Sequence, residues 1–279
     1  MKALIEEIER QHRVRLGSPQ LVGGGNISQS YRCGDYFLKI NDRDFAANFE
    51  AEAFNLEAIA ATKTVRVPCV VATDRFQSHS YLLLEYLPLR PLTSKAEREL
   101  GTQLASLHQV EQSLPGFERD NFIGATPQPN GSRPNWVTFW KEQRLGHLFT
   151  LAAQSDIEFE GRRELLARLP ELLPHSPRYS LLHGDLWGGN AACLDDETPV
   201  IYDPACYYGD SLVDIAMSQL FGGFSSDFYR SYSQSQPLDA DRDEERLELY
   251  HLYHLLNHAI LFGSSYARQA QQIITKLLR

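Results

Sequence analysis

Short apolar runs bounded by turn residues dominate the first third of the chain. Two of these runs flank Gly34-Asp35, a turn signal that predicts a β-hairpin. Pro68 interrupts another run and places it at the edge or the start of a strand, because proline has no amide hydrogen to donate. Residues 44–61 are rich in Ala and Glu without Gly or Pro, which predicts a helix. The strand-like runs span residues 30–33, 36–40, 65–71 and 80–86.

Helical spacing of apolar residues takes over in the rest of the chain. A strand at 179–182 and a hairpin over 191–203 interrupt it, and residues 120–135 have a loop-like composition. Strands and helices are therefore segregated, as in α+β proteins. We predict a small N-terminal antiparallel β lobe, residues 1–87, and a larger, mostly helical C-terminal lobe, residues 88–279. The expected helices cover residues 97–108, 136–148, 157–173 and most of the chain after 214, with breaks at 222–223 and 263–265.

The composition is that of an ordinary globular chain with a net charge of −9. The acidic balance argues against nucleic acid or an anionic membrane as the main partner. Residues 1–10 have an amphipathic helical pattern rather than that of a secretory signal, and no apolar stretch approaches the length of a membrane span. The four cysteines form no Cys-x-x-Cys pair. We therefore expect a cytoplasmic protein with reduced thiols.

The strongest chemical signal is the segment 183–190, His-Gly-Asp-Leu-Trp-Gly-Gly-Asn. Its spacing matches the H-x-D-x-x-x-x-N pattern of kinase catalytic loops. Such a loop can place Asp185 beside a substrate hydroxyl while Asn190 offers its carbonyl oxygen to Mg²⁺. Asp203 follows Asn190 by 13 positions, after a predicted hairpin, where a second Mg²⁺-binding carboxylate is expected. Each residue alone fits an ordinary loop, but the ordered set predicts ATP- and Mg²⁺-dependent phosphoryl transfer.

Other prominent side chains are interpreted as structural. His183 is expected to hold the loop through its imidazole, and Asp214 to support the loop or cap a helix. Three aromatic residues share one helical face, for which core packing is the default interpretation. Three histidines share another face, but no ligand from elsewhere completes a zinc site. The aromatic residues are Trp136, Phe139 and Trp140, and the histidines are His251, His254 and His258.

Taken together, these motifs resemble those of the aminoglycoside phosphotransferase and choline kinase superfamily, and more closely those of the fructosamine kinase family. The Leu-Trp-Gly-Gly sequence inside the catalytic loop and the Tyr-Tyr-Gly sequence after Asp-Pro-Ala favour the fructosamine kinase family over the other families of the superfamily. The matching stretches follow the family order and cover most of the chain. They are residues 37–41, 64–68, 120–124, 183–190, 203–210 and 220–224.

The resemblance implies a two-lobed protein-kinase-like fold and an ATP:ketosamine 3-phosphotransferase. Such an enzyme phosphorylates the 3-hydroxyl of a ketosamine, such as fructosamine or ribulosamine, and thereby takes part in deglycation. The implied partner is a small-molecule ketosamine or a glycated lysine on a protein. The implied cofactors are ATP and Mg²⁺, and the expected assembly is a monomer or a weak homodimer.

The resemblance also assigns roles to individual residues. Asp185 resembles the catalytic base, and Asn190 and Asp203 resemble the two Mg²⁺ ligands. Lys39 resembles the lysine that contacts the α- and β-phosphates of ATP. A helical glutamate should orient this lysine, and Glu52 is the preferred candidate. Glu50 remains its rival, because the sequence does not fix which of the two faces inward.

The glycine-rich turn before the first predicted hairpin resembles a phosphate-binding loop. Gly23, Gly24 and Gly25 would let the backbone approach the phosphates closely, although they match neither G-x-G-x-x-G nor a Walker A motif. Some family members carry a cysteine here that is linked to redox control. This chain has Asn26 and Ile27 instead, so that regulation is not transferred.

The adenine and acceptor sites are assigned from the same resemblance. Backbone groups of Glu85 and Leu87 would bind adenine at the junction of the lobes, and Trp187 would form one face of the acceptor site. A protein kinase is disfavoured because no long activation segment and no Ala-Pro-Glu follow Asp203. The remaining alternatives are a kinase for an aminoglycoside, choline or another small alcohol, and a nucleotide-binding scaffold without activity.

Overall fold

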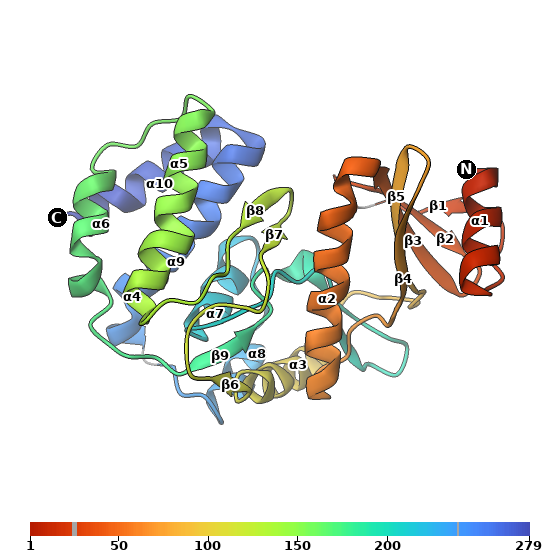
Figure 1. The fold of residues 1–279 in the computed structure, drawn as a ribbon. Helices are drawn as coiled ribbons and strands as arrows, with labels where there is room; N and C mark the ends of the chain where they lie inside the picture. The colour runs from red at the N-terminus through yellow and green to blue at the C-terminus, as the bar shows by residue number, and fades with distance from the viewer. Residues whose placement is uncertain (24–26, 239) are drawn as a thin grey trace.

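The computed structural model describes residues 1–23, 27–238 and 240–279, and at 240–242 and 264 it describes the backbone only. Figure 1 shows a sheet at the N-terminal end, a helical mass at the C-terminal end, and one long helix, α2 (Ala46–Thr62), between them. The sheet is antiparallel, in the order β1-β2-β3-β5-β4. Its strands are β1 Gln20–Leu21, β2 Gln29–Cys33, β3 Tyr36–Asp42, β4 Val70–Phe76 and β5 His79–Glu85.

Helices cover both faces of this sheet and so fix the direction of each side chain. The first helix, α1 (Lys2–His12), packs against Leu38 and Ile40 of β3. Helix α2 covers the opposite face, where it packs against Leu82 of β5. Successive side chains of a strand alternate between faces. Lys39, which pairs in register with Leu82, therefore points toward α2 and the second lobe.

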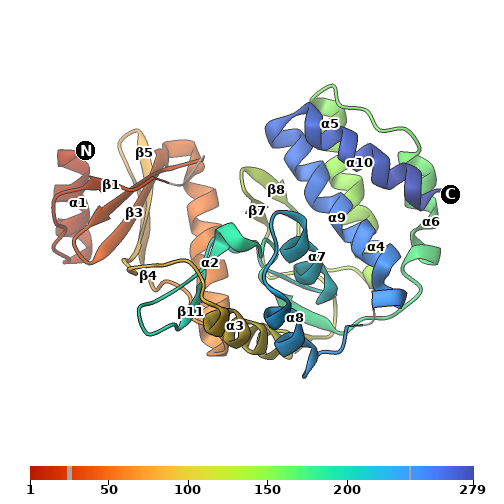
Figure 2. The same cartoon turned by 180° about the vertical axis from the view of Figure 1, so that it is seen from behind.

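The C-terminal lobe is mostly helical and contains several short strands (Figure 2). Strands β12, β9 and β6 form one sheet in that order, and β7-β8 and β10-β11 form two hairpins. Within the described ranges, no helix is long and apolar enough to span a bilayer. The helices are α3 Ser94–Leu107, α4 Trp136–Phe139, α5 Gly146–Gln154, α6 Arg162–Leu172, α7 Leu212–Leu220, α8 Ser226–Ser233, α9 Ala240–Phe262 and α10 Ser264–Leu277. The strands are β6 Glu111–Gln112, β7 Asn121–Ile123, β8 Thr126–Gln128, β9 Tyr179–Leu182, β10 Ala191–Cys193, β11 Pro199–Ile201 and β12 Tyr207–Gly209.

The segregation of a β lobe from a helical lobe is as predicted, but several boundaries are not. The strand predicted at 65–71 starts too early, since β4 begins only at Val70, beyond the proline that cannot donate a ladder hydrogen bond. The edge position predicted from that proline is confirmed, because β4 is the last strand of the sheet. The helix predicted at 157–173 begins later, after Gly161, whose positive φ of 75° marks a turn. The predicted loop at 120–135 contains the β7-β8 hairpin.

The aromatic face predicted to be core is buried. Trp136 and Trp140 pack against Tyr250 of α9, and Trp136 Nε1 donates to the Tyr250 hydroxyl at 2.9 Å. The helix between them continues through π-helical turns at 140–145 into α5. On α9, His254 is fully buried, and neither of its ring nitrogens has a partner among the described residues. Burial lowers the pKa of His254 to about 3, so its ring is neutral.

Candidate active site

The segment 183–190 forms the loop between β9 and β10 and ends in a 3₁₀ turn at Gly188–Asn190. Asn190 Nδ2 donates to the Asp185 carbonyl oxygen at 2.9 Å and to Asp185 Oδ2 at 3.1 Å. Asp185 N donates to His183 Nδ1 at 3.2 Å, and His183 Nε2 lies 3.0 Å from the Tyr202 carbonyl oxygen. Burial lowers the pKa of His183, and a neutral ring protonated at Nε2 satisfies both contacts. The buried imidazole therefore holds the loop together.

The chain that carries Asp203 packs directly against this loop. Ala205 N donates to the His183 carbonyl oxygen at 2.8 Å. Gly184 has a positive φ of 83°, and a Cβ at this position would lie 2.1 Å from the Ala205 carbonyl oxygen. Only glycine permits this approach of the two backbones. Asp203 itself adopts a positive φ of 56°, which is uncommon for a residue other than glycine.

A buried carboxylate fixes the start of the catalytic loop from α7. Asp214 accepts hydrogen bonds from the backbone amides of His183 and Gly184, each at 2.8 Å, and lies 3.1 Å from His108 Nε2. Burial alone would raise the pKa of Asp214, but these donors outweigh it and the pKa is lowered. The contacts match the predicted support of the loop.

Lys39 joins the two lobes electrostatically. Its Nζ lies 2.7 Å from Glu52 Oε1 on α2 and 2.6 Å from Asp203 Oδ1. Glu50, the rival candidate, instead forms an exposed ion pair with Arg75 at 3.1 Å. The difference of two positions on α2 turns one glutamate toward the cleft and the other toward solvent. Lys39, Glu52 and Asp203 thus form one charged cluster across the lobes.

The carboxylates around Lys39 carry more negative charge than its ammonium can balance. Burial and the nearby Asp203 charge raise the pKa of Asp185 to about 7. Burial likewise raises the pKa of Glu52 to about 7, although Lys39 opposes this shift. Burial would lower the pKa of Lys39, but the Asp203 and Glu52 charges outweigh it and raise that pKa. Carboxylates with raised pKa values, such as Asp185 and Glu52, are suited to receive a cation or a proton.

The donor set of this cleft fits a hard divalent cation. The Asn190 amide nitrogen is used within the loop, whereas its Oδ1 accepts no hydrogen bond from the described residues. Asp203 presents a carboxylate that is 48% exposed, with Oδ1 bound to Lys39. An amide oxygen, a carboxylate oxygen and room for water are the ligands that Mg²⁺ prefers. Asn190 and Asp203 are the residues that would hold it.

The glycine-rich turn is described only in part, because Gly24 and Gly25 lie outside the described residues. A Cβ at Gly23 would meet nothing within 4 Å, so the turn is open on that side. Its far end is fixed by Asn41 of β3, whose Nδ2 donates to the Ile27 carbonyl oxygen at 2.9 Å. The chain before the undescribed residues thus pairs with β2, and the chain after them is bonded to the strand that carries Lys39.

The junction between the lobes uses the Glu85 side chain for structure. Its carboxylate accepts from Cys69 N at 2.6 Å and pairs with Arg66. The Leu87 carbonyl oxygen accepts from Leu89 N at 2.8 Å, whereas the Leu87 amide hydrogen has no partner in the described part of the chain. The junction thus offers a free backbone donor, the kind of group that binds an adenine ring nitrogen.

Trp187, within the segment 183–190, lies at the edge of an aromatic cluster centred on Phe221. Its half-buried ring covers Gly189, where a Cβ would meet the ring at 2.3 Å. The ring meets Phe221 edge-on, with centroids 6.3 Å apart, and Phe221 in turn packs against His258 and Tyr266. His258 is thus a packing residue, as predicted, and its ring extends the aromatic surface that begins at Trp187.

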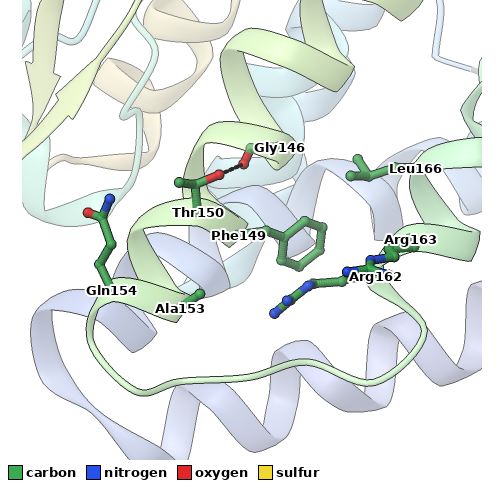
Figure 3. Close-up of a pocket in the computed structure, with 8 residues that line it drawn as sticks. All are labelled: Gly146, Phe149, Thr150, Ala153, Gln154, Arg162, Arg163 and Leu166. Carbon is green, nitrogen blue, oxygen red and sulfur yellow. Dashed lines mark hydrogen bonds between the residues drawn. The ribbon is translucent and has the colours of Figure 1, made fainter.

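A separate groove of about 440 Å³ lies between α5 and α6. Figure 3 shows Phe149 and Thr150 on one side of it and Arg162, Arg163 and Leu166 on the other. None of the residues that line it belongs to the catalytic loop, the lysine cluster or the glycine-rich turn. This groove is therefore distinct from the candidate active site.

Comparison with known proteins accords with this geometry. The model of the fructosamine kinase family matches residues 1–279. This chain belongs to the fructosamine kinase family. It is 42% identical over 282 residues to a probable ketoamine kinase of Vibrio parahaemolyticus, an alignment that covers 99% of this chain and 95% of the relative. Family membership and such relatives indicate a phosphotransferase of the ketoamine kinase type.

Solved structures support the same fold. The crystal structure of a putative fructosamine-3-kinase from Haemophilus somnus has a TM-score of 0.91 at 29% identity, and the match covers 99% of this chain and 97% of that one. A thermostable mutant of aminoglycoside phosphotransferase APH(4)-Ia, in ternary complex with ADP and hygromycin B, has a TM-score of 0.63 at 14% identity, covering 99% and 98%. The two-lobed fold of the fructosamine kinase family is thus shared with aminoglycoside phosphotransferases.

Sequence reasoning missed several buried polar residues next to the site. His108, which contacts Asp214, ends α3 and carries no motif. Asn55 lies on α2 one turn after Glu52 and is almost fully buried. An asparagine in the middle of an Ala-rich helix is an unfavourable choice unless its amide has a partner, and this signal could have drawn attention to it.

Proposed function

We propose that this protein is an ATP- and Mg²⁺-dependent kinase that phosphorylates the 3-hydroxyl of a ketosamine. One observation carries the proposal: Lys39 of the N-terminal lobe bonds to Asp203 at 2.6 Å, and the chain before Asp203 is bonded to Asn190, which in turn bonds to Asp185. A related fold binds ADP in the aminoglycoside phosphotransferase complex, which supports the choice of nucleotide.

In the proposed reaction the protein positions the reactants and neutralises charge. The Lys39 ammonium binds the α- and β-phosphates, and Glu52 holds it in place. Asp185, with its raised pKa, accepts the hydrogen bond and finally the proton of the acceptor hydroxyl. A magnesium ion held by Asn190 and Asp203 would supply charge neutralisation at the phosphates. The free amide of Leu87 is available to bind adenine.

The acceptor is proposed to lie over Trp187. A flat, half-buried ring beside Asp185 suits the face of a sugar, and the neighbouring Phe221 extends the apolar surface. The ketoamine kinase relatives support a ketosamine, such as fructosamine or ribulosamine. Whether the amine is free or is a protein lysine does not change the chemistry at the cleft, and we propose that both are accepted in deglycation.

The proposal is tested by a coupled assay of ADP release with synthetic fructosamine, synthetic ribulosamine, choline and an aminoglycoside as acceptors. We expect Mg²⁺-dependent turnover with the ketosamines, and a phosphate on the 3-oxygen of the product by phosphorus and carbon NMR. Turnover with choline or the aminoglycoside alone would move the protein to a small-alcohol kinase. Nucleotide binding without turnover of any acceptor would favour an inactive scaffold.

A further inference from the structure

Three consecutive backbone carbonyls follow Asp203, and each accepts a hydrogen bond from a different buried amide side chain. Asn55 Nδ2 donates to the Pro204 carbonyl oxygen at 2.8 Å. Gln128 Nε2 donates to that of Ala205 at 3.1 Å, and Asn121 Nδ2 donates to that of Cys206 at 2.7 Å. Each backbone carbonyl of residues 204–206, next to the proposed Mg²⁺ ligand Asp203, is therefore fixed by its own hydrogen bond.

The amides are also bonded to one another and form a ladder. Asn121 Nδ2 donates to Asn55 Oδ1 at 3.2 Å, and Gln128 Nε2 donates to Asn121 Oδ1 at 2.7 Å. The Tyr253 hydroxyl on α9 donates to Gln128 Oε1 and closes the end of the ladder. The side chains are at most 2% exposed, where an unmet hydrogen bond is costly. A fully bonded ladder is thus rigid.

The ladder connects elements of both lobes. Asn55 belongs to α2, one turn from the glutamate that holds Lys39, whereas Asn121 and Gln128 belong to the β7-β8 hairpin. Figure 1 shows this hairpin between α2 and the C-terminal helices. Because one set of bonds reaches α2 and the chain after Asp203 together, it fixes Glu52 and Asp203 relative to each other.

Fixing these two residues has a specific value in this chain. Asp203 sits at a positive φ of 56°, which its surroundings must maintain. Only residues 204–206 separate it from β12, so no activation segment is present to order the site. In a kinase of this type, Glu52 must pair with Lys39 while Asp203 is in place to bind Mg²⁺.

We propose that Asn55, Asn121 and Gln128 are positioning residues that hold the Lys39–Glu52–Asp203 cluster assembled at all times, so that the enzyme needs no activating modification. The inference rests on the proposed kinase function, because it assigns the ladder to the geometry of the Mg·ATP site. The three amides touch neither nucleotide nor acceptor, and they act through the carbonyls of residues 204–206.

The test compares Asn121→Leu with a matched control, Asn130→Leu. Asn130 is another fully buried asparagine of the same connection, but its amide is bonded to the Arg119 carbonyl oxygen and to Arg144, not to residues 204–206. Both variants should lose stability. Loss of an outer support of a metal site typically costs about 10- to 100-fold in metal affinity or activity. We expect Asn121→Leu to raise the half-saturating Mg²⁺ concentration and lower kcat by such a factor, with an unchanged KM for the acceptor, whereas folded Asn130→Leu should match wild type.

A second measurement, hydrogen exchange of the unliganded protein, does not depend on turnover. Amides in the peptide covering residues 200–208 should exchange faster in Asn121→Leu than in wild type or Asn130→Leu. If Asn121→Leu fails to fold, Gln128→Met removes the donor to Ala205 and should act in the same direction with a smaller effect.

Equal Mg²⁺ dependence and equal exchange in both asparagine variants would overturn the proposal. Wild-type protein that neither binds nor turns over Mg·ATP would instead overturn the proposed kinase function, and exchange at 200–208 would still report on the ladder.

Discussion

Two buried carboxylates, Asp210 and Asp214, and one half-buried carboxylate, Asp185, lie in the C-terminal half of the chain, and their pKa values shift in opposite directions. Asp210 accepts hydrogen bonds from His175 and Tyr250, each at 2.7 Å, and its pKa is lowered although burial alone would raise it. The pKa of Asp214 is likewise lowered, although burial alone would raise it. In the cleft, Asp185 receives one amide hydrogen bond, and burial raises its pKa to about 7.

The hydrogen-bond donors and the neighbouring charges together explain this difference, because Asp185 has one donor and faces the negative charge of Asp203. A carboxylate that the fold supplies with several donors is stabilised in its charged form and serves the structure. A carboxylate that is buried with too few donors costs stability, and it is retained where a ligand supplies the missing charge. The comparison therefore separates a supporting pair, Asp210 and Asp214, from Asp185, the proposed catalytic base.

The largest expected effect is on turnover in Asp185→Asn. The amide cannot accept the hydroxyl proton, and general base catalysis typically contributes about 10²- to 10⁴-fold. We expect kcat to fall by about 10³-fold, while the affinity for ATP, measured by calorimetry, and the urea midpoint stay near those of wild type. Undiminished turnover would remove Asp185 from its assigned role, and a large loss of stability would break the comparison.

Asp214→Asn should show the opposite pattern. An asparagine can accept a hydrogen bond from only one of the two loop amides with its oxygen, and its NH₂ group faces the other. We expect the free energy of unfolding, from urea titration, to fall by about 2–3 kcal/mol. Turnover should fall with it, because the catalytic loop loses its support. A variant as stable as wild type would show that the loop is held by other contacts.

The two glutamates of α2 sharpen the comparison within one helix. Glu52→Gln weakens the hold on Lys39, so we expect the KM for ATP to rise and kcat to fall by about 10-fold in total. Glu50→Gln removes only an exposed ion pair with Arg75, a kind that contributes about 0–1 kcal/mol, and should leave both constants unchanged. Steady-state kinetics of both variants against ATP decide the matter, and equal effects would contradict the assignment of Glu52.

The smallest effect concerns pH and Asp210. Because the folded pKa of Asp210 is lowered, its stabilisation is present above the unfolded value of about 3.9 and is lost as the pH falls through the folded value. Asp210→Asn should cost roughly 1.5 kcal/mol at pH 6. The difference from wild type should shrink below pH 4 in urea titrations across pH. A difference that stays constant with pH would show that Asp210 is not charged in the folded protein.

Sequence patterns predicted the parts of the site that depend on local spacing. Asp185 and Asn190 lie five positions apart within the segment 183–190, so the local spacing was enough to predict that they lie close together. The hairpin that leads to Asp203 follows directly along the chain. The alternation of a strand sent Lys39 to one face, away from Leu38. However, β4 begins later than predicted, because Pro68 has no amide hydrogen to donate to a ladder hydrogen bond.

Contacts between residues far apart in the chain escaped prediction. The choice between Glu52 and Glu50 depends on how α2 is rotated over the sheet. The bonds that join Asn55 to residues 121 and 204 span more than 60 positions, and no local pattern encodes them. The aromatic surface around Trp187 likewise gathers residues from three separate segments.

By itself, the sequence determined which residues can carry the chemistry and in which elements they lie, because loop spacing and strand alternation act over a few residues. Only the tertiary structure decided which carboxylates are satisfied by the protein and which are not. That outcome depends on donors brought by other elements and on the burial of each group, and both are properties of the packed chain. The raised pKa of Asp185 and the lowered pKa of Asp214 express this difference.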